Sequence, residues 1–193
     1  MKRREFLLMA GGAFGAGLIS AGCTTTRPNT PADRVARRQE IDSAADGALQ
    51  RLYANARGSR EMADRAAGIL VFPRVLSGGL GVGGEFGDGV LRTPIRPEGY
   101  YRLIGGSIGW QIGGQSQAVI LMFMTQDALE RFRRSKGWTV GADASVAVAK
   151  VGATGEIDTN TAKQSIVGFA LTNAGLYAGA KLEGAKVTQI DVV

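Results

Sequence analysis

The sequence predicts an α+β domain in which a glycine-rich, mostly antiparallel sheet, curved or closed toward a small barrel, packs with about three helices. Helical periodicity occurs in three separate stretches, near residues 34–56, 60–67 and 126–136. From residue 69 onward most other apolar runs are short and strand-like. Many of the 29 glycines fall in these runs, and strands with one face free of side chains permit tight curvature.

Residues 1–22 are predicted to be an export signal rather than part of the fold. A basic head containing Arg3 and Arg4 precedes an apolar run from Phe6 to Ala21. This run is shorter, and richer in glycine and alanine, than a membrane span of roughly 20 strongly apolar residues. The segment from Arg3 to Leu7 is similar to the twin-arginine signal of bacteria, which directs folded proteins to export.

Cys23, the only cysteine, is predicted to become the acylated N-terminus, because Ser20–Cys23 resembles the bacterial lipoprotein box. A lone thiol in an exported protein has no disulfide partner, and two or three acyl chains hold a protein firmly at a membrane. The box usually has Leu, Val or Ile where Ser20 stands, and the alternative is a soluble exported protein. Thr24 after the cysteine is similar to lipoproteins forwarded to the outer membrane.

Residues 23–32 are predicted to be a lipidated flexible tether, because this stretch is rich in Thr, Pro and Asn and has no apolar periodicity. Residues 33–193 then form one domain, since about 170 residues suffice for one core and are too few for two. Removal of the signal lowers the net charge from +6 to +4, because it takes away three basic residues and one acidic residue. The remaining charge is a modest bias toward anionic partners such as phospholipid headgroups.

Residues 34–56 are predicted to form the first helix and residues 60–67 the second. The second helix has Ser59 as its expected N-cap and Gly68 as its expected stop. In the first helix, apolar residues recur at helical spacing and form one stripe, which consists of Ile41, Ala45, Ala48, Leu49, Leu52 and Ala56.

Residues 77–84 contain the pattern G-x-G-x-x-G, which in a phosphate-binding loop opens a helix. The following Glu85–Gly89 is a poor helix start and is typical of a hairpin turn, so a strand is favoured over a phosphate cradle. We expect Gly79, Gly81 and Gly83 to leave one face of this strand smooth for closely packed backbone. A valine at Gly81 or Gly83 should therefore disrupt packing.

The remaining strands follow from apolar runs. Ile69–Phe72 is a short strand ended by Pro73, and residues 119–124 are apolar on both faces, as in a buried central strand. Residues 104–113 alternate, which predicts a packed face made by Ile104, Ile108, Trp110 and Ile112. Later strands are expected in a stretch whose one face holds Trp138, Val140, Val146 and Val148, and at residues 166–171 and 176–182.

The third helix is predicted over residues 126–136. Thr125 is its expected cap and Gly137 its expected stop. Leu129 and Phe132 are expected to point inward, toward the sheet.

The chain contains no histidine, which removes the commonest general base, the Ser-His and Cys-His nucleophile pairs and the usual zinc ligands. The acidic residues are scattered without the spacing of a calcium loop. No zinc-finger, RRM or KH signature occurs. We therefore expect no enzyme activity, no metal, no cofactor and no nucleic-acid partner.

Four ordered motifs resemble the SYLF-domain family, over roughly residues 45 to 190. They are Gly78–Gly83, then Tyr100-Tyr101 followed by Gly106–Gly113, then Gly141–Ala147, and finally Gly175–Gly184. Members of this family are non-enzymatic lipid-binding modules. Eukaryotic members bind phosphoinositides and some bind actin, and bacterial relatives are often exported lipoproteins. The resemblance thus implies a lipid-binding domain.

Two segments depart from the family pattern. Lys150–Ala153 replaces a usual Gly-Pro-x-Gly-Arg segment, and Leu171–Gly175 replaces the Tyr-Ser-x-Ser-x-Gly form. These departures leave the scaffold in place and make actin binding doubtful.

The first candidate site for lipid headgroups is a basic cluster at the end of the third helix, made of Arg131, Arg133, Arg134 and Lys136. Arginine donates paired hydrogen bonds to phosphate. The alternative interpretation is that these cations complement the negative C-terminal end of the helix.

The second candidate is the pair Arg37 and Arg38 on the first helix, for which a solvated helix face is the alternative. We expect a membrane-anchored, non-catalytic lipoprotein of the bacterial envelope whose domain binds anionic phospholipid headgroups. The alternative is an envelope scaffold that binds another protein or peptidoglycan. A hydrolase with serine and lysine chemistry is a third class, which no S-x-x-K arrangement supports.

Overall fold

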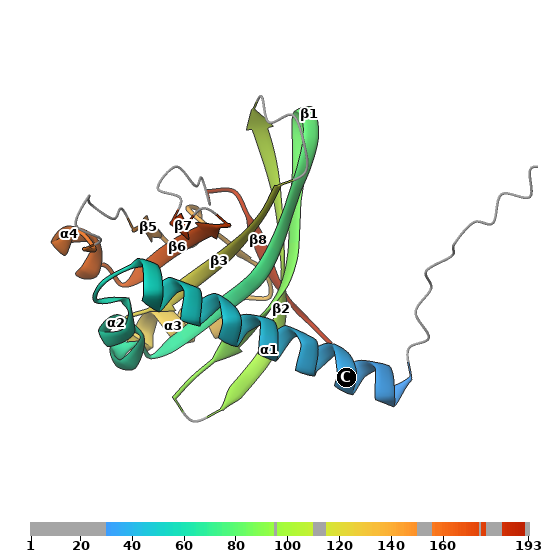
Figure 1. The fold of residues 1–193 in the computed structure, drawn as a ribbon, viewed down its shortest axis with the longest axis horizontal. Coiled ribbons are helices and arrows are strands. Elements are labelled where there is room, and N and C mark those ends of the chain that lie inside the picture. Colours follow the sequence, from blue (N-terminus) through green and yellow to red (C-terminus); the bar gives the residue numbers. More distant parts are fainter. Residues whose placement is uncertain are drawn as a thin grey trace, which may run out of the picture.

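The computed structural model describes residues 30–94, 96–109, 115–149, 156–173, 175–176 and 183–191. The predicted signal, Cys23 and most of the predicted tether lie outside the described residues. Figure 1 shows helices packed on a strongly curled, mostly antiparallel sheet that forms a half-barrel. The predicted α+β fold class is therefore confirmed.

Helix α1 spans Pro31–Asn55 and begins with a capping box. The Asp33 backbone N–H donates to the Thr30 side-chain oxygen over 3.2 Å, and the Thr30 N–H donates to the Asp33 carboxylate over 3.2 Å. The helix thus takes in the last two residues of the predicted tether. All six residues of the predicted apolar stripe are buried, from Ile41 to Ala56.

Helix α2 spans Ser59–Arg65, and the expectation that Ser59 caps it was wrong. Gly58 is the N-cap, with a φ of 80° in the left-handed region that glycine tolerates. Ser59 is the first helical residue, and its hydroxyl donates to the carbonyl of Ala56 over 2.6 Å. The helix ends at Arg65, before Gly68.

Helix α3 spans Gln126–Arg134. The Thr125 cap is confirmed, because its side chain accepts from the Ala128 N–H over 3.2 Å. Leu129 and Phe132 are buried as expected. The helix ends at a Ser135 cap, earlier than the expected stop at Gly137.

Strand β1 spans Gly68–Arg92, which is much longer than the strand expected to end at Pro73. The register with β3, Gln115–Phe123, shifts between Phe72 and Val75. A bulge at this point accommodates proline, which has no N–H for the ladder. The chain therefore continues as a strand past Pro73.

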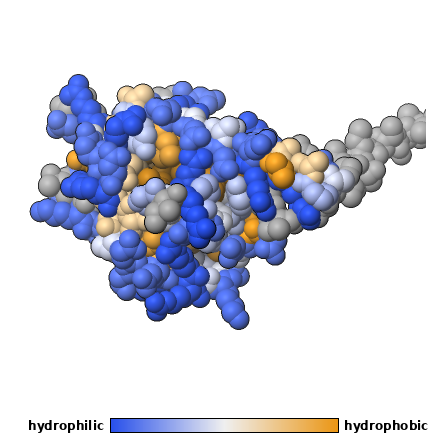
Figure 2. All heavy atoms as spheres, turned by 90° about the horizontal axis from the view of Figure 1, so that it is seen from below, coloured by the Kyte–Doolittle hydropathy of each residue, from blue (hydrophilic) through white to orange (hydrophobic). Residues whose placement is uncertain are grey.

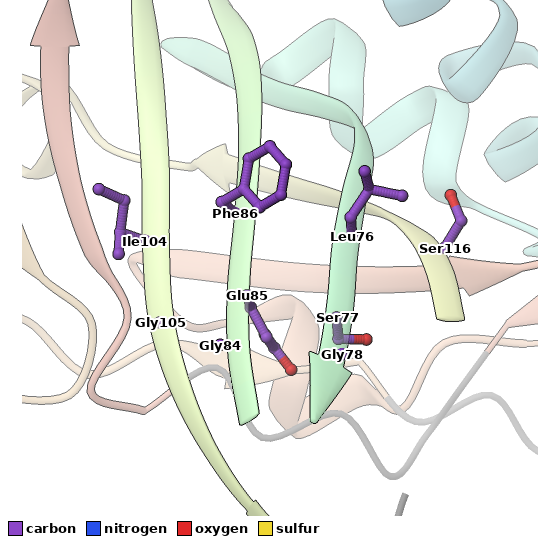
Figure 3. A pocket seen from close by; sticks show the side chains of 9 residues that line it. All are labelled: Leu76, Ser77, Gly78, Gly84, Glu85, Phe86, Ile104, Gly105 and Ser116. Carbon is purple, nitrogen blue, oxygen red and sulfur yellow. The ribbon is translucent and has the colours of Figure 1, made fainter. Parts of the chain in front are cut away.

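The prediction of a hairpin turn at Glu85–Gly89 was wrong. These residues lie inside β1 and pair with β2, Pro97–Gly109. Instead, the two halves of β1 lie side by side (Figure 3). A Cβ atom on Gly87 would lie 2.5 Å from the carbonyl oxygen of Arg74 in the first half. The first half of β1 pairs with β3 and the second half with β2. As expected, no helix follows the glycine pattern.

One strand face was expected to hold the apolar residues from Trp138 to Val148. The structure has two short strands in this stretch instead. Strand β4, Trp138–Thr139, pairs with β8, whereas β5, Ala147–Val148, pairs with β6 in parallel. The other strands are β6 Ile166–Thr172, β7 Gly175–Leu176 and β8 Lys186–Ile190, and α4 spans Thr159–Ala162. The strand order is β4-β8-β2-β1-β3-β6-β5, with β7 beside β6. Most of the strand expected at residues 176–182 lies outside the described residues.

The sheet has a hydrophobic core on each face. Helices α1 and α2 bury alanine and leucine side chains against one face, where Ile120, Phe169 and Val90 also lie. On the other face, Phe132 of α3 packs against Phe123 with ring centroids 5.0 Å apart, and against Trp138 at 5.5 Å. Apolar residues on both sides of β3 confirm that it is a buried central strand.

Candidate functional site

Asp88 on β1 holds two arginines on the face of the sheet that α1 covers. The β1–β2 register places Asp88 directly opposite Arg102, which donates to its carboxylate from Nε over 2.7 Å and from Nη2 over 3.1 Å. Arg37 of α1 donates to the same carboxylate. Two guanidinium groups around one carboxylate leave an excess of one positive charge at this point.

The Asp88 carboxylate is largely buried, with 17% of its side chain exposed. Burial alone would raise its pKa, but the hydrogen bonds from Arg102 and Arg37 outweigh burial and hold the pKa of Asp88 below its usual value. The group therefore stays charged at neutral pH and fixes the start of α1 on the sheet.

An apolar groove lies next to the Asp88–Arg102 pair, on the same face of β1 and β2. The register places Phe86 opposite Ile104, and these side chains are 56% and 54% exposed. Leu76, in the first half of β1, is 41% exposed and stands beside them (Figure 3). The groove has a volume of about 590 Å³, within the range of roughly 300–1,000 Å³ typical of small-molecule sites.

The expectation that Ile104 lies on a packed face was wrong. The buried residues of this strand are its neighbours of opposite parity, Tyr101 and Leu103, which pack toward α3. Ile104 shares a face with Tyr100, which packs against the α1 core. The face is the one that α1 covers, but Ile104 lies beyond the helix and remains exposed. Ile108 lies outside the residues whose side chains are described, and Trp110 and Ile112 lie outside the described residues.

Glu85 also lines the groove, but its position along β1 has the opposite parity to the apolar side chains. It alternates with Phe86 along β1, and a Cβ atom on its partner Gly105 would lie 3.7 Å from Glu85 and 3.6 Å from Ala185, which belongs to the core on the other face. Partial burial raises the pKa of Glu85. On the strand face that Phe86 and Ile104 share, the position next to Phe86 is therefore not occupied by the Glu85 side chain.

Arg38, the other predicted headgroup residue on α1, lies over the ring of Tyr100 with 5.9 Å between the guanidinium carbon and the ring centroid. The Tyr100 hydroxyl donates to Asp42 over 3.0 Å. Burial, and then the hydrogen bond to Asp42, raise the pKa of Tyr100. Both predicted arginines of α1 are therefore fastened to β1 or β2 near the groove.

The predicted cluster on α3 lies over the opposite face of the sheet, because α3 packs on the other core. Its arginines are paired with acidic neighbours. Arg131 contacts Asp127 over 2.8 Å and Arg134 contacts Glu130 over 2.7 Å, both one helical turn apart. Arg133 pairs with Glu98. Three acidic groups thus offset most of the positive charge of Arg131, Arg133, Arg134 and the exposed Lys136.

The sequence did not single out Asp88, Arg102, Phe86 or Leu76. Arg102 and Ile104 are two residues apart and therefore share a strand face, but only the pairing of β1 with β2 brings Asp88 and Phe86 opposite them. Within the part of the chain that the structure describes, no group of three or more His, Cys, Asp or Glu side chains is placed to hold a metal ion.

Seen from below, the face of the molecule in Figure 2 is largely hydrophilic, with several smaller apolar areas between the hydrophilic side chains. Among the described residues, no helix is both long and apolar enough to cross a membrane. The groove of Leu76, Phe86 and Ile104 beside the Arg37 and Arg102 guanidinium groups is therefore the candidate functional site.

The fold and this surface define a small α+β module with a cationic and an apolar part side by side. Residues 104–191 match the model of a family described as Ysc84, Las17-binding protein actin regulator. Over these residues the chain is similar to this SYLF-domain family, in agreement with the resemblance found in the sequence. The motifs at Gly78–Gly83 and Tyr100-Tyr101 precede the matched range. No curated protein matches the chain.

Proposed function

We propose that the protein is an exported lipoprotein, anchored through Cys23 to the outer membrane, whose domain binds anionic phospholipid headgroups and catalyses no reaction. Similarity of residues 104–191 to the SYLF family supports a lipid-binding or actin-binding module, and the sequence of the export signal supports the anchor. The observation that carries the headgroup proposal is the excess positive charge of Arg37 and Arg102 around Asp88 beside exposed apolar side chains.

The α1 surface suits an anionic ligand better than the α3 cluster does. Arginine donates paired hydrogen bonds to phosphate oxygens, and Arg37 and Arg102 share a single carboxylate. The arginines of the α3 cluster each have an acidic partner. Each uncompensated basic side chain near an anionic surface contributes about 1 kcal/mol. This is weak in solution, but the anchor would raise the effective concentration of the domain at the membrane.

Vesicle flotation of the chain from Thr24 onward tests this function without the anchor. All the described contacts lie at or after residue 30, so this form retains them. We expect flotation with phosphatidylcholine vesicles that contain phosphatidylglycerol, weaker flotation at 300 mM than at 50 mM salt, and none with pure phosphatidylcholine. Flotation that depends neither on salt nor on phosphatidylglycerol would remove the headgroup proposal.

Two variants of this form separate the two surfaces. Arg37→Gln should weaken association about fivefold, as the loss of about 1 kcal/mol implies. The matched variant Arg134→Gln, which also removes one positive charge and breaks an exposed pair on α3, should lose less. The opposite order would place the headgroup site on α3.

An envelope scaffold is the second candidate, because the description of the matched family names protein binding. In that case crosslinking of the intact protein in cells would capture one specific envelope protein or peptidoglycan, and flotation would stay weak at every lipid composition. The departures at Lys150–Ala153 and Leu171–Gly175 argue against actin as that partner.

A further inference from the structure

We propose that the groove formed by Leu76, Phe86 and Ile104 holds one acyl chain of an anionic phospholipid whose phosphate lies on Arg37 and Arg102. This inference rests on the proposed function and extends it from the headgroup to the whole lipid. The ligand is then a single lipid molecule bound by its charged part and one hydrocarbon chain, rather than a membrane surface attracted by charge alone.

Strand register sets the spacing of the two parts of the site. Asp88 pairs with Arg102, and the next pair on the same face is Phe86 with Ile104. Residues two apart on a strand are separated by about 6.6–6.8 Å. The third pair of this face is Gly84 with Gly106, and a Cβ atom at either glycine would meet nothing within 4 Å. Along this face, a charged pair is therefore followed by an apolar pair and then by a glycine pair with open space above it.

The order of these three pairs matches an anionic amphiphile. A phosphate at Arg37 and Arg102 would meet the excess positive charge, and the first methylenes of its chain would lie on Phe86 and Ile104. The open glycine pair leaves room for the chain to continue over Leu76 and Ser116, a cross-strand pair that also lines the groove. A chain in the reverse direction would place hydrocarbon on the guanidinium groups, which is unfavourable.

Hydrocarbon is also the occupant that the size of the groove favours. Three partly exposed apolar side chains fall far short of the roughly 800 Å² per partner of a stable protein interface, so a second copy of the chain is a poor fit. Burial of hydrocarbon contributes about 0.8 kcal/mol per methylene. A few methylenes in the groove therefore stabilise the complex by more than one phosphate contact does.

Photo-crosslinking of the intact lipid-anchored protein in phosphatidylcholine nanodiscs tests the proposal. The probes are phosphatidylglycerol and phosphatidylcholine, each with a diazirine in one acyl chain, and peptide mass spectrometry locates the adducts. We expect adducts on Leu76, at least fivefold more with the phosphatidylglycerol probe. Arg37→Gln should reduce them to the level of the phosphatidylcholine probe, and Asp88 keeps its Arg102 partner in that variant.

The double variant Phe86→Ser with Ile104→Ser should also lose the Leu76 adducts, because both replaced side chains are more than half exposed and their loss leaves the core intact. The matched control is Val35→Ser on α1, which replaces a valine that is 52% exposed and lies outside the groove. The control should keep the Leu76 adducts, and all variants should melt near the parent temperature.

Equal Leu76 adducts with both probes would overturn the proposal, because the phosphate would then play no part. Their absence with both probes would also overturn it, and would favour a peptide segment of a partner as the occupant. If the chain from Thr24 onward still floats with acidic vesicles in that case, the headgroup function stands without the groove. If it does not float, the proposed function fails as well.

Discussion

Gly89 lies directly against the backbone of Val71 across the two halves of β1. A Cβ atom on Gly89 would overlap the carbonyl oxygen of Val71 and would lie 3.0 Å from Cε1 of Phe72, a fully buried ring. Close approach of two segments of one strand thus depends on the missing side chain at this position. The sequence-based expectation assigned close approach to Gly79, Gly81 and Gly83, and for these three glycines it stays a prediction.

Gly89→Ala should destabilise the protein by about 1–3 kcal/mol, because the added methyl group forces backbone and a core phenylalanine apart. Gly84→Ala is the matched control, since a Cβ atom there would meet nothing within 4 Å. Urea unfolding of both variants measures the effect. If both variants unfold with the parent, the close approach does not constrain the fold.

The ion pairs around Asp88 should make stability depend on pH. The pKa of Asp88 in the folded protein is below its usual value of 3.8. The charged carboxylate therefore stabilises the fold above about pH 4, and this contribution is lost as the pH falls from 4 through the lower folded pKa. At pH 7 the wild-type protein should need more urea to unfold than Asp88→Asn does, and the difference should shrink steadily below pH 4.

Glu130→Gln is the control for the Asp88 prediction. It breaks an exposed pair on α3, where 51% of the Glu130 side chain and 80% of the Arg134 side chain are accessible, and such pairs contribute only about 0.3–0.5 kcal/mol. Its unfolding midpoint should stay close to that of the parent at pH 7. A difference between the wild type and Asp88→Asn that persists at pH 2.5 would contradict the assignment.

Replacement of Arg131, Arg133, Arg134 and Lys136 by glutamine should leave the melting temperature nearly unchanged. The pairs of Arg131 and Arg134 are exposed and one helical turn apart, and charges at a helix end contribute about 0.3–1 kcal/mol each. Calorimetry of the quadruple variant checks this. A drop of more than 10 °C would mean that these cations act mainly in the fold, Arg133 with Glu98 above all.

Cys23 should carry the lipid anchor in the native protein. Peptide mass spectrometry of the bacterial membrane fraction should find an N-terminal peptide that begins at Cys23 and carries the mass of two or three acyl chains. The motivating pattern is a lone cysteine after small residues at the end of the apolar run. A free N-terminus at any other residue would exclude the anchor and leave the soluble exported alternative.

Local signals were sufficient to predict α1, α2 and α3, although not every cap and not the short helix α4. The apolar stripe from Ile41 to Ala56 and the Thr125 cap depend on residues three or four positions apart, whose interactions form within one or two helical turns. The strand at residues 119–124 was also predictable, because a run that is apolar on both faces suits only the middle of a sheet.

Only the tertiary structure decided the strand boundaries and the candidate site. The alternating pattern that includes Ile104 indicates that the two faces of the strand differ in polarity. Whether Ile104 is buried depends on how far α1 extends over the sheet, and Ile104 lies beyond the helix. Glu85–Gly89 has the composition of a turn, yet pairing with β2 holds it extended. Asp88 is 14 residues away from Arg102 in the sequence. It is 51 residues away from Arg37, its other partner. The sequence determines the identity of each of these residues. Whether they meet depends on strand register and helix docking, because both are contacts between distant segments of the chain.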